Sequence, residues 1–211
     1  MMKKEEQEIK EEILEAAYKL FFRYGLKSVT MDDMAKEMSV SKKTLYQYFK
    51  DKNDVIETAL TKHIGQEIHC FDTLKKDSID SIELIHKISR HIRSSLGNIN
   101  STLLHDLEKY HKKAWKKFKE FKRNYIYKWM EETLEEGKAE GHFRSEINSE
   151  ILANLRILEI EMSFDANAFD FQKYDLATVQ GQLFDHFIYG ILTEKGLKLY
   201  QDYQKETIHE N

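Results

Sequence analysis

A short polar segment, Ser39 to Val55, concentrates side chains that can bind a polyanion. Its seventeen residues, SVSKKTLYQYFKDKNDV, include four lysines, two tyrosines and one phenylalanine. Lysine ammonium groups pair with phosphate oxygens as point charges, and tyrosine hydroxyls donate hydrogen bonds to the same kind of oxygen. These residues therefore predict recognition of a phosphate backbone.

Signatures of common catalytic and nucleotide-binding sites are absent. The sequence contains no GxGxxG, GxxxxGK[ST], GxSxG or HExxH pattern. His63, Glu67 and Cys70 are spaced at i, i+4 and i+7, which would place three metal-ligating groups on one helical face. Because histidines scattered over amphipathic helices produce such triplets by chance, we predict neither an enzyme nor a metal or cofactor site.

The composition predicts an all-α protein. None of the 211 residues is proline and only eight are glycine, so little interrupts helix formation. Charged residues make up 33% of the chain, and no apolar run approaches the roughly 18 residues that a membrane span needs. The first ten residues, MMKKEEQEIK, lack the apolar stretch of a secretory signal. We therefore predict a soluble, cytoplasmic protein that does not bind membranes.

Two short helices are predicted to position the lysines and tyrosines. Thr30 precedes the segment MDDMAKE, Met31 to Glu37, whose two aspartates suit the exposed amides of a first helical turn. Ser41 is placed to cap a second helix that ends near Tyr48. A connection of about three residues between such helices is typical of a helix-turn-helix.

The helix that follows Ser41 would enter a major groove of DNA. Its first turn would present polar and basic side chains to base edges, and its later residues would reach the sugar-phosphate backbone. Leu45 and Phe49, four residues apart, are predicted to anchor the helix on its own core. The alternative is that its lysines form only a solvated face. The side chains predicted to face DNA are Lys42, Lys43, Thr44, Tyr46, Tyr48, Lys50 and Lys52.

The run SVTMDDMAKEMSVSKKTLYQYFKDKNDV, Ser28 to Val55, resembles the TetR family of bacterial transcriptional regulators. The segments EEGKAEGHFRSEIN and LFDHFIYGILTEKG resemble later parts of the same family. The resemblance implies a helix-turn-helix DNA-binding domain at 1–52 and a helical effector-binding and dimerisation domain at 53–211, with 53–74 as the linking helix. It also implies that Thr30 contacts DNA, and Ser41 completes the predicted surface.

Aromatic residues recur at helical spacing in the middle of the chain. Such a stripe is more often ordinary core than the wall of a pocket, but the family resemblance implies an effector cavity. Nine lysines or arginines also fall within 109–128, which we interpret as a solvated face, with a partner or anionic effector as the alternative. The residues predicted for the effector pocket are Tyr110, Trp115, Phe118, Phe121, Tyr125, Trp129 and Phe164.

Two helices near the C-terminus are predicted to pair with their copies. The segment 151–164 is apolar on nearly every side and 176–192 is also strongly apolar, and a helix that is apolar all round must be covered all round. We expect a symmetric homodimer to cover them, with a larger monomeric core as the alternative. The residues predicted for the interface are Leu155, Leu158, Met162, Phe184, Phe187, Ile188 and Ile191.

These features predict a ligand-responsive transcriptional regulator, a repressor by analogy with the resembled family. It would bind a palindromic site on double-stranded DNA as a homodimer and would be released by a small hydrophobic or amphipathic effector. The alternative is a dimeric helical ligand-binding or interaction protein without a role in DNA regulation. Salt-sensitive binding to DNA distinguishes the two.

Overall fold

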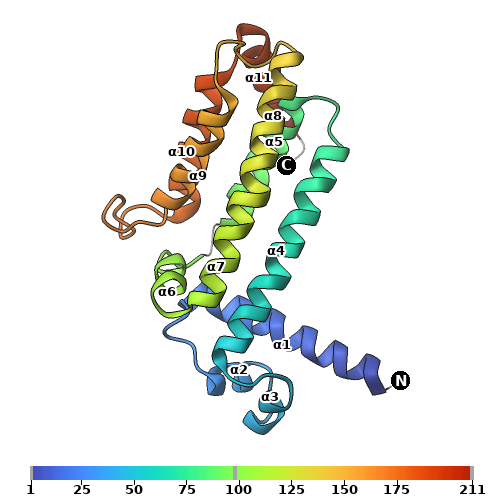
Figure 1. Ribbon diagram of the computed structural model, residues 1–211, viewed down its shortest axis with the longest axis vertical. Coiled ribbons are helices and arrows are strands. Elements are labelled where there is room, and N and C mark those ends of the chain that lie inside the picture. Colours follow the sequence, from blue (N-terminus) through green and yellow to red (C-terminus); the bar gives the residue numbers. More distant parts are fainter. Residues whose placement is uncertain (1, 97–98, 210–211) are drawn as a thin grey trace. The chain divides into compact units, whose positions relative to one another are not determined.

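The computed structural model describes residues 2–96 and 99–209, which are mostly helical (Figure 1). These residues contain no β-strand, and one isolated bridge joins Phe143 and Leu192. The all-α prediction is therefore confirmed. None of the helices in the described residues is both long and apolar enough to span a membrane. In chain order the elements are α1 (Met2–Tyr24), α2 (Met31–Glu37), α3 (Lys42–Tyr48), α4 (Lys52–Lys76), α5 (Ser81–Leu96), α6 (Leu103–Tyr110), α7 (Lys112–Phe121), the π-helical segment η1 (Lys122–Ile126), α8 (Tyr127–Ala139), α9 (Ser149–Met162), α10 (Leu176–Ile191) and α11 (Glu194–His209).

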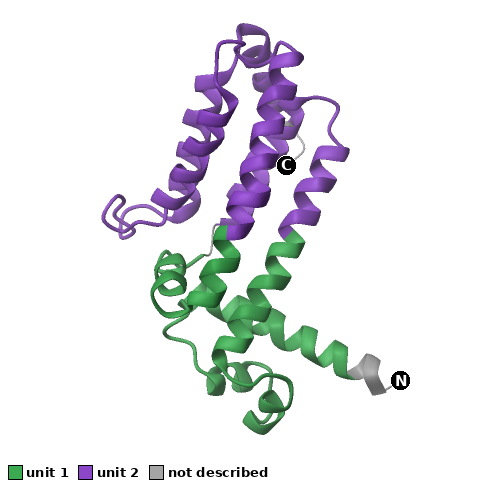
Figure 2. Ribbon diagram, in the orientation of Figure 1, with its two compact units in different colours: residues 1–66, 98–119 green, residues 67–97, 120–211 purple. Residues whose placement is uncertain are grey.

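The chain divides into two compact units (Figure 2). Unit 1 comprises residues 1–66 and 98–119, and unit 2 comprises residues 67–97 and 120–211. Because the boundaries fall inside α4 and α7, each of these helices contributes to both units. These units are defined by packing and not by function. The division into a DNA-binding domain, 1–52, and an effector-binding and dimerisation domain, 53–211, stays a prediction.

Unit 1 is built on the apolar face of α1. Ile13, Ala17 and Phe21 are buried on this face, at the spacings of four that the sequence pattern requires. Gly25 follows the helix in the left-handed region, with φ at 81°, and its N–H donates to the carbonyl of Phe21 at 2.9 Å. Glycine adopts this conformation without a Cβ clash, so α1 ends where the sequence predicts. Further buried residues of unit 1 are Leu26, Val29, Met34, Leu45, Phe49, Val55, Ile56, Leu104, Leu107 and Ala114.

Unit 2 has its core where α10 packs on α5 and α8 packs on α9. Gly181 of α10 admits the side chain of Arg93 from α5, since a Cβ at that position would lie 2.4 Å from Arg93 Nη1. The Arg93 guanidinium then donates to Asp185 at 2.6 Å. Close contact between helix backbones and side chains at this point fixes α10 against α5.

The α5 contact bears on part of the predicted dimer interface, which stays a prediction. One face of α10 is already covered within the chain, because it packs on α5. Its buried side chains therefore lie in the core of unit 2. The predicted interface residues affected are Phe184, Phe187, Ile188 and Ile191, which are at most 4% exposed.

Helix α9 was predicted to be apolar on nearly every side, but its buried side carries charged residues. Its buried side carries Arg156 and Glu159, whose side chains form an ion pair at 3.1 Å. Its exposed side carries four large apolar residues one or two turns apart. Those residues, with their exposed fractions, are Ile151 (64%), Leu155 (42%), Leu158 (59%) and Met162 (43%).

Candidate DNA-binding surface

Helix α2 begins with a reciprocal cap. The hydroxyl oxygen of Thr30 accepts from the Asp33 N–H at 3.2 Å, and the Asp33 carboxylate accepts from the Thr30 N–H at 2.8 Å. This is a capping box, which satisfies backbone donors that the first helical turn leaves open. Hydrogen bonds from Thr30 hold the pKa of Asp33 below its ordinary value. Thr30 is thereby held in place at the start of the helix-turn-helix.

The connection between α2 and α3 is short and tightly bonded. Ser39 occupies the left-handed region at φ 55°, a conformation that is uncommon for residues other than glycine, asparagine and aspartate. The N–H of Val40 donates to the carbonyl of Ala35 at 3.0 Å and thereby closes the turn. These bonds direct the chain from the end of α2 into Ser41.

Helix α3 is capped at its start, and its inner face is anchored in the core of unit 1. Ser41 Oγ accepts from the Thr44 N–H at 3.1 Å, and the two hydroxyl oxygens lie 2.8 Å apart. Leu45 is fully buried and Phe49 is 2% exposed, as the spacing of four predicts. The cap defines where α3 begins and the two apolar side chains define which face turns inward.

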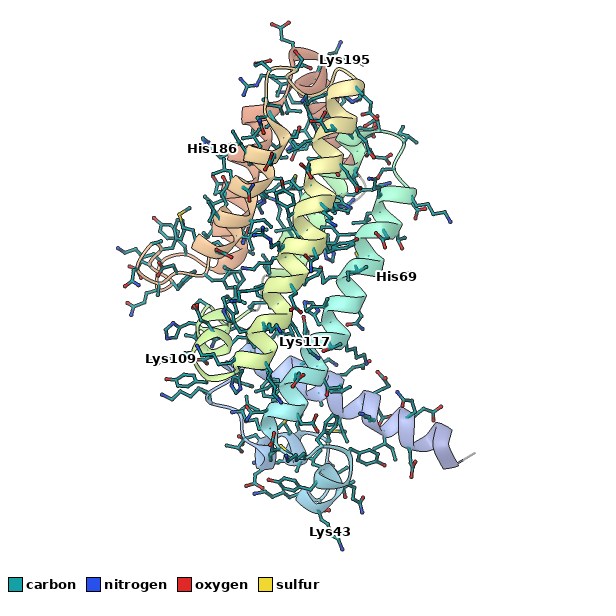
Figure 3. All side chains as sticks on the ribbon, in the orientation of Figure 1. Lys43, His69, Lys109, Lys117, His186 and Lys195 are labelled. Carbon is teal, nitrogen blue, oxygen red and sulfur yellow. The ribbon has the colours of Figure 1, made fainter. Side chains whose placement is uncertain are left out.

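The outer face of α3 carries a cation, a phenol and an amide. Lys43 is exposed, and Figure 3 shows its side chain extending away from the helix. Tyr46 is 49% exposed, Gln47 is exposed, and Tyr48 is half-buried. Gln47 was not among the residues predicted from the sequence, although its place beside Tyr46 on a helix anchored by Leu45 indicates an outward direction. An amide in this position can bond a base edge.

The lysines that flank this face differ in solvent exposure and in whether their ammonium groups already have a partner. Lys42 Nζ pairs with Asp32 of α2 at 2.9 Å, and this hydrogen bond raises the pKa of Lys42. Lys50 is exposed, and its backbone N–H donates to Asp54 at 2.9 Å. Lys52 is half-buried and burial lowers its pKa. The side chain of Lys50 is thus better exposed to a phosphate than that of Lys52.

The start of α1 borders the end of α3. Tyr48 and Gln47 line a shallow pocket together with Glu6, Gln7 and Lys10. The ammonium of Lys10 lies 5.5 Å from the ring centre of Phe49, within the range of a cation–π contact. Lys10 therefore adds a positive charge near the end of α3 that sequence spacing alone did not assign.

The aromatic residues predicted for an effector pocket fall into both units. Tyr110, Trp115 and Phe118 belong to unit 1, and the other four, Phe121, Tyr125, Trp129 and Phe164, belong to unit 2. The rings of Trp115 and Phe118 are 5.7 Å apart, and the stacked rings of Phe121 and Tyr125 are also 5.7 Å apart. Tyr110 is exposed, whereas Trp129 is buried. Their role in binding an effector stays a prediction.

Part of the basic segment 109–128 has structural partners. Lys117 pairs with Glu57 at 3.1 Å and donates to the Thr61 hydroxyl at 3.0 Å, both on α4. Lys122 is buried and forms an ion pair with Glu161 of α9. The interpretation of this segment as a solvated face is therefore incomplete, because these two lysines join helices.

The histidine, glutamate and cysteine triplet of α4 does not converge. His63 contacts the Tyr18 hydroxyl through Nδ1 at 3.0 Å, in unit 1. Glu67 and Cys70 instead both contact His91 of α5, in unit 2. Across the described residues, no group of three or more histidine, cysteine, aspartate or glutamate side chains is arranged to hold a metal ion.

Comparison with known proteins identifies the helix-turn-helix. Residues 13–59 match the family described as bacterial regulatory proteins, tetR family. An HTH-type transcriptional regulator of Staphylococcus aureus, strain bovine RF122 / ET3-1, is 33% identical over 107 residues. This match covers 51% of the chain and 57% of the relative, so the chain spans little more than half the length of this curated protein.

Solved structures share the fold over most of the chain. A TetR-family transcriptional regulator from Agrobacterium tumefaciens has a TM-score of 0.74 at 14% identity, covering 89% of this chain and 99% of that one. The regulator FadR of Bacillus subtilis in complex with stearoyl-CoA has a TM-score of 0.63 at 22% identity, covering 85% and 97%. The capped α2–α3 motif lies inside the residues that match the tetR family of bacterial regulatory proteins, and the chain shares its fold with these solved structures.

Proposed function

We propose that the protein is a ligand-responsive transcriptional regulator, of the repressor type, that binds a palindromic DNA site as a homodimer. The observation that carries the proposal is the polarity of α3, a helix capped by Ser41 and anchored by Leu45. It directs Lys43, Tyr46 and Gln47 outward within the residues that match the TetR family. Helices with this exposure and length fit a major groove.

A second copy of the chain is the partner that α9 favours. Its apolar stripe, Ile151, Leu155, Leu158 and Met162, repeats at intervals of four, three and four residues, the spacing of a seam between helices. Soluble monomers rarely expose a contiguous apolar row of this kind to water, and such rows mark interaction sites. A two-fold dimer would bury the stripe against itself and would offer two α3 helices to grooves about 34 to 36 Å apart.

A small molecule is proposed to control the DNA affinity through α4. Because α4 begins beside α3 and continues into unit 2, a ligand held in unit 2 would act on the helix that also supports the DNA-binding surface. The FadR fold, shared by this chain, accommodates stearoyl-CoA in that protein, which supports an effector with an apolar body. A coupling free energy of about 1 to 3 kcal/mol would change DNA affinity roughly 5- to 150-fold.

The test is DNA binding by the full chain as a function of salt. Fluorescence anisotropy with a labelled duplex from upstream of its own gene, and with an unrelated duplex of equal length, gives affinities at several salt concentrations. We expect a steep loss of affinity with salt and a preference for the upstream duplex. Binding that is absent on every duplex at low salt would support the alternative of a ligand-binding or interaction protein.

Variants of α3 and its flank separate positioning contacts from base contacts. Lys50→Ala is expected to weaken binding to both duplexes equally and to reduce the salt slope by about one. Lys43→Ala is expected to change the preference between duplexes. The matched control is Lys198→Ala on α11, which removes the same charge from an exposed position in unit 2. An unchanged salt slope in Lys50→Ala would remove that residue from the proposed surface.

A further inference from the structure

The corner between α6 and α7, residues 108–113, concentrates exposed lysines in unit 1. Lys109 lies in the last turn of α6, and Lys112 and Lys113 are the first two residues of α7. All three side chains are exposed, and Figure 3 shows Lys109 on the outer side of α6. Glu108 is also exposed. With these three lysines against the one carboxylate of Glu108, the α6–α7 corner is positively charged.

Contacts within the chain do not account for the two lysines that begin α7. Lys117, one turn further along the same helix, pairs with Glu57 at 3.1 Å and thereby joins α7 to α4. Lys112 and Lys113 have no such ion pair within the described residues. The structural role that explains Lys117 therefore leaves their two charges unexplained.

The position of these lysines in the first turn of α7 is electrostatically unfavourable for the helix. The N–H groups of a first turn carry partial positive charge, which carboxylates stabilise and ammonium groups do not. Helix α2 follows this rule with Asp32 and Asp33, whereas the first turn of α7 has no acidic residue. An anion bound beside Lys112 and Lys113 would relieve the repulsion between their charges and the helix dipole. This is a second observation, independent of exposure, that indicates an anionic ligand.

Two hydrogen bonds join the α6–α7 corner to both ends of the helix-turn-helix. The N–H of Lys27, in the link before α2, donates to the carboxylate of Asp106 in α6 at 3.1 Å. The Nδ1–H of His111 donates to Oδ1 of Asn53 at 2.7 Å, and Asn53 is three residues after Lys50. All of these residues belong to unit 1. The lysines of the corner are therefore held next to the segments that flank the DNA-binding surface.

We propose that Lys112 and Lys113 form a second phosphate-binding site, which contacts the backbone of the same DNA duplex that α3 binds. This inference rests on the proposed DNA-binding function and adds phosphates beyond those that Lys50 reaches. Duplex DNA carries one negative charge per about 1.7 Å of its axis, so two adjacent ammonium groups meet phosphates on any base sequence. The site raises the affinity for every duplex and carries no sequence preference.

The placement of the corner favours DNA over other polyanions. An acidic protein or an anionic membrane would be attracted by the same charge, but neither requires the corner to be bonded to both flanks of the helix-turn-helix. A duplex bound to α3 already brings phosphates to Lys50, near Asn53, which accepts from His111. DNA is therefore the occupant whose position the contacts of unit 1 specify.

The first test measures the salt dependence of DNA binding by the full chain with Lys112→Ala and Lys113→Ala combined. On both the upstream and the unrelated duplex, the salt slope should fall by about one for each lysine, so the advantage of the native chain narrows roughly tenfold between about 50 and 200 mM salt. Replacing both lysines by arginine keeps the charges and should keep the native slope. The matched control is Lys76→Ala with Lys198→Ala, which removes two exposed charges from unit 2 and should leave the slope unchanged.

This measurement separates the failure of the second site from the failure of the proposed function. A native chain that binds no duplex at low salt would overturn both. If the native chain binds and Lys50→Ala lowers its salt slope, a native slope in the Lys112→Ala and Lys113→Ala variant would overturn the second site alone. Circular dichroism establishes that each variant is folded.

The second test locates the phosphates by ethylation interference on the upstream duplex. Ethylation removes the charge of a single phosphate, so it weakens binding only where the protein contacts that phosphate. We expect two sets of sensitive phosphates with the native chain, one lost in Lys50→Ala and a different one lost when Lys112 and Lys113 are both alanine. The same interference pattern for the native chain and the double variant would contradict a direct contact.

The third test examines His111 as a positioning residue that acts through Asn53. His111→Ala removes the donor to Asn53 and should lower the salt slope toward that of the double lysine variant, although it removes no lysine. Adding His111→Ala to the double variant should then lower the slope no further, because the three changes act on one contact. A further fall in the triple variant would contradict positioning through Asn53.

A parallel measurement uses vesicles of phosphatidylserine and phosphatidylcholine in place of DNA. Cosedimentation of the native chain and of the Lys112→Ala and Lys113→Ala variant should be equal, since the site is assigned to DNA. Vesicle binding that depends on the two lysines, together with a native salt slope on DNA in the double variant, would assign the corner to a membrane surface and overturn the proposal.

Discussion

Helices α3 and α9 have opposite polarity. Helix α3 buries Leu45 and turns Lys43 and Tyr46 to solvent. Helix α9 buries Arg156 and Glu159, and its exposed side carries the apolar stripe Ile151, Leu155, Leu158 and Met162. A helix of the first kind is stable in water as it stands, whereas the second kind exposes apolar area that association would remove. The difference shows that exposed charge and exposed apolar area predict different partners.

The buried charges of α9 are fully engaged with α10. The guanidinium of Arg156 donates to Glu159 at 3.1 Å and to Gln180 Oε1 at 3.0 Å. It also lies 5.0 Å from the ring centre of Phe184. Gln180 Nε2 in turn donates to the Ser163 hydroxyl at 2.5 Å. Because each polar group has a partner, the network fixes how α9 and α10 face each other.

The largest expected effect comes from breaking this network. Arg156→Ala leaves the Glu159 carboxylate buried without its cation and should lower the free energy of unfolding by about 3 to 5 kcal/mol. Urea unfolding followed by circular dichroism measures the change. A loss below about 1 kcal/mol would mean that water or another group readily compensates Glu159.

A double variant separates the charge from the packing. Arg156→Met combined with Glu159→Leu removes both charges and retains apolar side chains of similar length. Its free energy of unfolding is expected to lie near that of the native chain, because replacing a buried ion pair by apolar residues is often neutral. A double variant as unstable as Arg156→Ala would show that Gln180 depends on the guanidinium.

The next largest effect concerns the apolar stripe of α9. Leu158→Ala removes an apolar contact twice in a two-fold dimer and should weaken self-association by about 2 to 3 kcal/mol, roughly 30- to 150-fold. Sedimentation equilibrium measures the dissociation constant. Ile79→Ala is the control, because Ile79 is 83% exposed and lies outside the stripe. If both variants associate as the native chain does, the stripe is not the interface.

The contrast between the two helices also explains what could be predicted from sequence. The start of α3 and its buried face depend on local signals, Ser41 as a cap and the pair Leu45 and Phe49, which are visible in a single segment. The burial of Arg156 and of Ile188 depends on α10 lying between α5 and α9, and no local pattern carries that information. Apolar residues on α10 were therefore predicted as an interface although α5 covers them.

Pairings between charged residues of different helices were missed for the same reason. The Lys42–Asp32 bond joins residues ten apart, on two helices whose crossing is set by the α2–α3 turn. The alignment of Cys70 with His91 likewise requires α4 and α5 to lie side by side. Sequence spacing placed Cys70 with His63 and Glu67 on one helix, but it could not supply the histidine of the neighbouring helix.

A smaller effect is expected at the cap of α3. Ser41→Ala removes the acceptor for the Thr44 N–H and should lower the free energy of unfolding by about 1 kcal/mol. Because the cap defines the first turn of α3, DNA affinity should fall as well. Thermal unfolding and anisotropy measure the two effects. Ser41→Asn keeps a side-chain acceptor and is expected to restore most of the stability, and a failure to do so would mean that the hydroxyl has another role.

The smallest expected effect tests whether Asp32 restrains the DNA-binding surface. Asp32→Asn frees Lys42 from its ion pair and removes a negative charge that would face the phosphates. Because the pair is exposed and its attraction is weakened by solvent, DNA affinity at low salt should increase about two- to threefold, and screening should abolish the gain at high salt. Asp202→Asn is the control, because Asp202 pairs with Lys205 on α11 in unit 2. Both variants change the net charge equally, so a gain confined to Asp32→Asn would place the restraint on α3 itself, whereas equal gains would assign it to the overall charge of the protein.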